Sequence, residues 1–159
     1  MTKVHIWKLA LIAFFIFFGC SNSKILRTPN ILKTGWYYIS DTSNAYKRQL
    51  DKTDEFYYII PEPIVTVNNF KQLEIREREY EGKKYFWLKM SLDEEGTKAW
   101  SIATGKSIGK HLAFILDNKL ISTPKVNAQI DGGMTALNRG NETRAELEKI
   151  KTIIEGEKK

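Results

Sequence analysis

One stretch, residues 85–133, constrains the fold more than any other, because it predicts a strand, a helix and a β-hairpin in that order. Residues 85–92 alternate between two faces, and the face that carries Phe86, Leu88 and Met90 is apolar. This period-two pattern with aromatic residues is typical of a strand that is buried on one side. The strand therefore needs a packing partner on its apolar face.

A helix is predicted directly after this strand. Asp93 offers a capping carboxylate at the helix start. Gly96 follows in the first turn, where the missing side chain allows a strand to approach closely. Gly105 and Gly109 are expected to end the helix and permit a reversal. One helical face is apolar and consists of Ala99, Trp100 and Ala103.

The second half of the stretch predicts a hairpin. Leu112–Leu116 is a continuous apolar run and indicates a buried strand. Asp117-Asn118 suits a two-residue turn, because both residue types tolerate positive φ. Leu120 and the residues after it return along the first strand until Pro124, which cannot donate to a ladder. We predict one more strand at Val126–Ile130.

The rest of the chain predicts further strands and one more helix. Asp41–Asp54 is polar and is expected to form a loop or a short irregular helix, and Pro61 is expected to end a strand. The sequence Thr143 to Glu146 fits a capping box and starts a helix to about residue 155. The remaining predicted strands are Gly35–Ile39, Glu55–Ile60, Ile64–Val67, Leu73–Tyr80 and Met134–Leu137. This order predicts an α+β domain with a mainly antiparallel sheet and two helices on one face.

The N-terminus has the pattern of a targeting segment. Residues 1–19 combine two lysines with a ten-residue apolar run, which is too short to cross a bilayer. Cys20 follows a glycine and is the single cysteine of the chain, so this site resembles the lipobox of bacterial lipoproteins. We expect a lipidated, flexible tether at residues 20–33 and a folded domain at residues 34–157. An ordinary secretory signal and an uncleaved anchor are the alternatives.

The central stretch resembles the first periplasmic head subdomain of the SecD/SecDF protein-export membrane proteins. That family carries an LDEEG strand end, a helix with an aromatic residue, and a segment similar to LAIVLDGKVISAP. The positions that match are Asp93, Gly96, Trp100, Gly109, Asp117 and Pro124. The resemblance implies a ferredoxin-like core. In the family, transmembrane helices couple proton flow to movement of a head that engages emerging polypeptide. No transmembrane bundle is evident here, so we expect that motor function not to carry over.

The sequence does not offer an obvious catalytic or metal centre. After the targeting segment it contains one histidine, His111, and no cysteine pair, so we expect no metal and no cofactor. The formal charge is +6, but the basic residues are scattered among acidic ones. This pattern indicates a solvated surface and not a nucleic-acid-binding stripe. We therefore expect a protein that is not an enzyme and does not bind nucleic acid.

The aromatic residues of two predicted strands give the best candidate for a binding surface. We expect them to offer a sheet face or edge that takes up extended peptide. The expected contact residues are Trp36, Tyr37, Tyr38, Tyr57 and Tyr58. The predicted protein is a lipid-anchored binding module for polypeptide or for an envelope complex, facing the periplasm, with the outer membrane favoured over the inner. The alternatives are an accessory structural lipoprotein with a specific protein partner, and an envelope enzyme.

Overall fold

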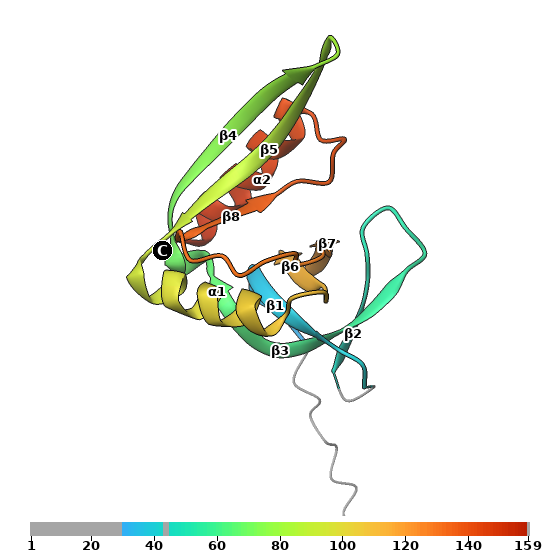
Figure 1. The fold of residues 1–159 in the computed structure, drawn as a ribbon. Helices are drawn as coiled ribbons and strands as arrows, with labels where there is room; N and C mark the ends of the chain where they lie inside the picture. Colours follow the sequence, from blue (N-terminus) through green and yellow to red (C-terminus); the bar gives the residue numbers. More distant parts are fainter. Residues whose placement is uncertain (1–29, 43–44, 159) are drawn as a thin grey trace, which may run out of the picture.

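The computed structural model describes residues 30–42 and 45–158 of the chain (Figure 1). The predicted signal peptide at residues 1–19 lies outside the described residues. The same holds for the predicted lipidation site Cys20 and for the tether before residue 30. The structure thus describes the predicted domain and residues 30–33 directly before it.

The described strands form two antiparallel sheets. The five-stranded sheet has the order β2-β3-β1-β6-β7, with β1 (Gly35–Ser40), β2 (Tyr46–Gln49), β3 (Phe56–Thr66), β6 (Leu112–Leu116) and β7 (Lys119–Ser122). The three-stranded sheet has the order β4-β5-β8, with β4 (Phe70–Tyr80), β5 (Lys83–Leu92) and β8 (Met134–Leu137). The helices are η1 (Val67–Asn69), α1 (Glu94–Lys106) and α2 (Arg144–Glu157).

The predicted α+β class is confirmed, but the arrangement of the layers differs from the expectation of one sheet. Strand β5 lies in the three-stranded sheet, whereas β6, the next strand along the chain, lies in the five-stranded sheet. The single sheet implied by a ferredoxin-like core is therefore divided in two here. Each helix packs mainly on its own sheet, α1 against β3 and α2 against β4 and β5 (Figure 1).

Two apolar cores hold the five-stranded sheet, one on each face. The larger core lies between the sheets and the helices and contains Trp36, Trp100 and Phe114 among its buried residues. The smaller core lies on the opposite face and contains Tyr37 and Ile115. Strands β1 and β6 thus bury side chains in both directions. This explains why the sequence of β6 is a continuous apolar run.

The start of α1 is fixed by hydrogen bonds to the short helix η1. Asp93 is the N-cap residue, as predicted, and its carboxylate accepts a hydrogen bond of 2.7 Å from the amide of Gly96. The Asp93 amide donates to the carbonyl of Asn69 at 2.9 Å. A side chain on Gly96 would meet that of Asn69, because its Cβ would lie 2.8 Å from the Asn69 Cβ. The close neighbour predicted at Gly96 is therefore η1 and not a strand.

The hairpin that follows α1 forms as predicted. Asp117 and Asn118 have φ values of 46° and 63°, which is the geometry of a two-residue turn with both central residues left-handed. Strand β7 ends at Ser122, two residues before Pro124. Before the hairpin, Gly109 has a φ of 80°, which L side chains rarely adopt, and reverses the chain after α1.

The prediction of a loop or irregular helix across residues 41–54 was wrong, because this segment contains strand β2. Only one side of the strand is half-buried, through Tyr46 and Arg48, whereas Lys47 and Gln49 are exposed. The strand lies at the edge of its sheet and pairs only with β3. An edge strand rich in polar residues shows almost no alternation of apolar and polar side chains, so β2 was not predicted from the sequence.

The two prolines do not divide β3, contrary to the prediction of separate strands at Glu55–Ile60 and Ile64–Val67. Strand β2 pairs only with Phe56–Ile59, so Pro61 needs no partner on that side. Against β1, the register shifts twice in the part of β3 that contains Pro63. Prolines are tolerated at such edges and irregularities.

Three other predictions of element bounds were also wrong. Val126–Ile130 is not a strand, because the amide of Ile130 donates to the Thr104 hydroxyl of α1 at 3.0 Å instead of joining a ladder. Gly105 lies inside α1, which continues to Lys106. Strand β4 begins at Phe70, three residues before the predicted start.

Candidate functional site

The first two predicted contact residues lie in the protein interior. Trp36 and Tyr37 are 1% and 0% exposed and belong to the two different cores. Strand β1, which carries them, pairs with β3 on one side and with β6 on the other. The structure therefore corrects the expectation for both residues, and β1 has no free edge for an added peptide strand.

The tyrosines of this group differ in their surroundings. The Tyr37 hydroxyl donates to the carbonyl of Lys33 at 2.7 Å, and burial raises the pKa of Tyr37 to about 12. Burial also raises the pKa of Tyr38 above its usual value. The Tyr57 hydroxyl donates to Glu55 at 2.8 Å, and this bond is the largest cause of the raised pKa of Tyr57. All three tyrosines are therefore neutral around pH 7.

The partly exposed tyrosines border one hollow but point to different faces of the sheet. Tyr38 and Tyr58 line this hollow on the side of the sheet that faces α1, and Tyr57 also borders it. Tyr57 packs against the smaller core, on the opposite side of the sheet. Neighbouring residues of a strand point to opposite faces, so the side chains of Tyr57 and Tyr58 point apart. The aromatic cluster read from the sequence is thus divided between two faces.

A larger apolar hollow, which we call the inter-sheet groove, lies between the two sheets. Its volume is about 650 Å³, and it is lined from one side by β5 and β8 and from the other by α1, β6 and the segment 124–130. Ile130 and Met134 remain 38% and 44% exposed beside it. Exposed apolar side chains that gather around a hollow are typical of a binding site.

Two tryptophan side chains form the floor of the inter-sheet groove. The rings of Trp36 and Trp100 lie with their centroids 5.1 Å apart at an interplanar angle of 50°. Neither indole N–H has a hydrogen-bond acceptor in the part of the chain that the structure describes. A buried indole N–H without an acceptor costs free energy, and both of these N–H groups lie beneath the surface of the groove.

The groove continues along the outer face of the three-stranded sheet. A second hollow of about 590 Å³ shares Trp87 and Ala136 with the inter-sheet groove and extends it towards Arg78, Tyr80 and Tyr85. Strand β8 borders the groove and is an edge strand of its sheet, since it pairs only with β5 among the described strands. Its outer backbone groups are thus available to an added strand.

The charges along the inter-sheet groove and its extension have one sign. Lys89 and Lys125 line the groove and Arg78 lines its extension. No carboxylate is found among the described residues that line either hollow. The sequence analysis missed this site, although the alternation of β5 already placed Tyr85 and Trp87 on the face opposite the core.

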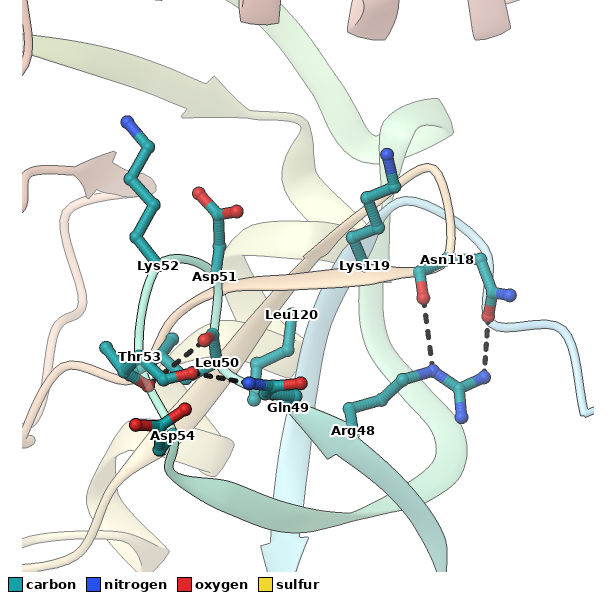
Figure 2. Close-up of a pocket in the computed structure, with 10 residues that line it drawn as sticks. All are labelled: Arg48, Gln49, Leu50, Asp51, Lys52, Thr53, Asp54, Asn118, Lys119 and Leu120. Carbon is teal, nitrogen blue, oxygen red and sulfur yellow. Dashed lines mark hydrogen bonds between the residues drawn. The ribbon is translucent and has the colours of Figure 1, made fainter.

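Another hollow, at the turn of the β6-β7 hairpin, is occupied by structural contacts. Figure 2 shows Arg48 directed at Asn118, whose carbonyl and side-chain oxygens accept from the guanidinium at 3.1 and 2.6 Å. The same side-chain oxygen accepts from the amide of Leu32 at 2.9 Å, and Arg48 also donates to the carbonyl of Asn30. These bonds fix the entry of the chain into the domain, so Arg48 serves the fold here.

The remaining chemically active side chains are dispersed. His111 is exposed and bonds through Nδ1 to the carbonyl of Thr123 at 2.7 Å. Across residues 30–42 and 45–158, no three His, Cys, Asp or Glu side chains gather as they would around a metal ion. Asp93 and Gly96 hold the start of α1, so these predicted motif residues serve the fold.

Comparison with known proteins identifies the domain. The family model of the SecDF P1 head subdomain matches residues 43–157. This chain belongs to the SecDF P1 head subdomain family. The resemblance predicted from the motif is therefore confirmed, and the matched residues include all the described strands except β1 as well as both α-helices.

Several protein translocase subunits are related to this P1 head subdomain. SecD of Rhodothermus marinus is 37% identical over 65 residues, which cover 41% of this chain and 10% of that protein. SecD of Rickettsia bellii is 46% identical over 43 residues, or 27% of this chain and 8% of that protein. The matched segments are thus about a tenth of the length of these relatives.

Solved structures of SecDF share the fold of the domain. A crystal structure of SecDF in its super-membrane-facing form has a TM-score of 0.54 and 22% identity, covering 61% of this chain and 12% of that one. A structure of SecDF described as a membrane component that enhances protein export has a TM-score of 0.52 and 22% identity, covering 61% of this chain and 42% of that one. Within the described residues, no helix is both long enough and apolar enough to span a membrane.

Proposed function

We propose that this P1 head subdomain is a non-enzymatic module that binds unfolded polypeptide in the inter-sheet groove. The observation that carries the proposal is the apolar groove beside the free edge of β8. Membership of a family found in protein translocase subunits supports a polypeptide as the ligand. The sequence analysis expected the same kind of ligand but placed it on β1 and β3.

An extended segment would bind by adding a strand to β8. Its backbone would pair with the outer edge of β8, while alternate side chains would enter the apolar groove next to Met134 and Ile130. Acidic residues in the segment would find Lys89 and Lys125 at the rim. Backbone pairing depends little on sequence, so the groove would accept many segments. Ordering a flexible peptide offsets much of the contact energy, so the affinity is about micromolar or weaker.

The test uses two alanine substitutions that add the same charge at different places. Ala136 is exposed in β8 and lines the groove, whereas Ala145 is exposed on α2. Ala136→Asp should abolish binding of an unfolded, apolar and acidic peptide, measured by anisotropy with the full chain in detergent. Ala145→Asp should bind as the wild type does. Equal binding by both variants would refute the groove as the site, and absence of binding by the wild type would favour the accessory-partner alternative.

We also propose that the domain is attached to the membrane through lipid on Cys20 and faces the periplasm, with the outer membrane favoured. The support comes from the sequence of residues 1–20, which lies outside the described residues. One acyl chain gives only marginal membrane binding, so stable attachment needs more than one chain. Cys20→Ser should release the protein from the membrane fraction or leave it unprocessed. Normal processing with unchanged membrane attachment would refute the lipid anchor.

A further inference from the structure

A second surface lies on the same side of the five-stranded sheet as α1, beyond the end of that helix. Trp36 is covered by Trp100 of α1, but Tyr38, two residues further along the same face of β1, is only partly covered. The hollow there has a volume of about 580 Å³. We call it the uncovered sheet face, and its aromatic and aliphatic side chains are Tyr38, Phe56, Tyr58 and Ile60.

Large apolar side chains are exposed on this face. Phe56 is 52% exposed and Ile60 is 37% exposed. Ile108, in the chain segment between the lining residues Ser107 and Lys110, is 55% exposed. A contiguous apolar surface of this kind marks an interaction site in a soluble domain. The backbone N–H and C=O groups of β1 and β3 bond to each other in this part of the sheet. A partner that docks on the face therefore meets side chains.

The rim of the uncovered sheet face is basic. Lys106 and Lys110 line it where α1 ends, and His111 follows. Lys47 stands on its other side, with Nζ 4.3 Å from the ring centroid of Phe56. Asp41 is the one carboxylate among the described residues that line the hollow. None of the three lysines has a carboxylate within 4 Å in the described part of the chain, so their charges are free to meet an anionic partner.

We propose that the uncovered sheet face docks on an anionic phospholipid surface. Tyrosine and phenylalanine rings insert at the level of the headgroups, where amphipathic rings are favoured, and the lysines meet the lipid phosphates. An extended peptide binds by backbone pairing at a strand edge, whereas this hollow lies over β1 and β3, which pair with each other. The docking is independent of the inter-sheet groove, which is lined by a different set of residues.

Docking would orient the domain on its membrane. Lys106 and Lys110 stand at the end of α1, and the inter-sheet groove opens along the other side of that helix, towards the segment 124–130. A domain held by its uncovered sheet face would therefore lie against the lipid without filling the groove. The proposal needs only the surface described above, and it holds whether or not polypeptide binds in the groove.

The experiment uses the full chain reconstituted in vesicles of phosphatidylcholine, with and without added phosphatidylglycerol. Phe56→p-benzoylphenylalanine places a photo-crosslinker on the uncovered sheet face, and mass spectrometry identifies the adduct. A phospholipid adduct that appears only with phosphatidylglycerol is expected. The same crosslinker at Tyr80, an exposed residue at the end of β4, should give no lipid adduct.

Charge reversals test whether the lysines carry the docking. Each lysine near an anionic surface strengthens binding roughly fivefold, so Lys47→Glu, Lys106→Glu and Lys110→Glu together should lower lipid crosslinking at least tenfold. The matched triple variant reverses the exposed lysines Lys71, Lys119 and Lys149, changes the net charge equally and should leave crosslinking unchanged. Circular dichroism verifies the fold of both variants. Equal loss in both, a polypeptide adduct, or no adduct at all would overturn the proposal.

Discussion

The two sheets of this domain differ in how many of their faces are buried. The five-stranded sheet has a core on each face, so β1 and β6 lie in the interior. The three-stranded sheet packs one face on α2 and the larger core, while its other face borders the inter-sheet groove. The hairpin of β4 and β5 extends beyond this contact, and its last residues are exposed (Figure 1).

This difference concerns how completely each sheet buries its aromatic side chains. Strand β1 is buried on both faces of its sheet, so its aromatic side chains pack in the two cores and stabilise the fold. The three-stranded sheet keeps aromatic side chains such as Trp87 half-exposed at a small cost, because its other face already packs on the core. Two tryptophans allow a direct test: Trp100, which packs from α1 on Trp36 of the five-stranded sheet, and Trp87 of the three-stranded sheet.

Trp100→Ala should have the largest effect. Trp100 is 3% exposed and packs on Trp36, so its removal should lower the free energy of unfolding by about 3–5 kcal/mol, the usual cost of deleting a large buried aromatic side chain. Trp87→Ala removes a half-exposed ring and should cost clearly less. Chemical denaturation of both variants measures the difference. Equal costs would contradict the difference in burial between the two tryptophans.

Arg139→Gln should have an intermediate effect, because Arg139 links the two regions. It donates to Asp51, in the loop between β2 and β3, and to Glu142, whose side chain is 0% exposed, each at 3.1 Å. The substitution removes the guanidinium from the buried Glu142 carboxylate, which keeps the backbone N–H of residue 139 as its one backbone donor among the described residues. We expect a loss of about 1–3 kcal/mol in the free energy of unfolding.

A matched arginine provides the control for this prediction. Arg144 pairs with Glu77 at 2.7 Å, but both side chains are about half-exposed at 51% and 43%. Exposed pairs contribute about 0–1 kcal/mol, so Arg144→Gln should cost less than Arg139→Gln. Thermal melts of the two variants give the comparison. If the two losses were the same, the link between the sheets would be no stronger than a surface ion pair.

Glu146→Gln should have the smallest effect, and it should depend on pH. The amide of Thr143, followed by its hydroxyl and by Lys52, lowers the pKa of Glu146 from 4.5 to about 2. A lowered folded-state pKa stabilises the protein above pH 4.5, and this contribution disappears as the pH falls towards 2. The melting temperature of the variant should approach that of the wild type across this window. A constant difference down to pH 2 would contradict the prediction.

The sequence predicted the elements whose burial follows a simple periodicity. Strand β6, with its continuous apolar run, was predicted with its observed bounds, and β5 only two residues too short. The caps at Asp93 and Thr143 were confirmed because a side chain bonded to a nearby amide needs no tertiary information. Local patterns therefore predicted β5, the start of α1 and the β6-β7 hairpin correctly within the central stretch.

The candidate site could not be predicted in the same way. The inter-sheet groove combines residues from β5, α1 and β8, and its existence depends on the division of the strands into two sheets. The period-two pattern of a strand indicates which of its residues share a face. It does not indicate whether a second sheet covers that face. The aromatic strands were therefore predicted correctly, but the binding role was assigned to residues that include Trp36 and Tyr37, which the structure buries.

The place of β1 in the sheet has a consequence for how the domain folds. Strand β1 comes first in the chain, yet it pairs with β6, which follows four other strands and the helices η1 and α1. Contacts between distant segments form slowly and only after the intervening chain is available. During synthesis, Trp36 and Tyr37 thus remain unpaired on one side until residues 112–116 emerge. The pairing of β1 with β6 is therefore among the last contacts of the five-stranded sheet to form.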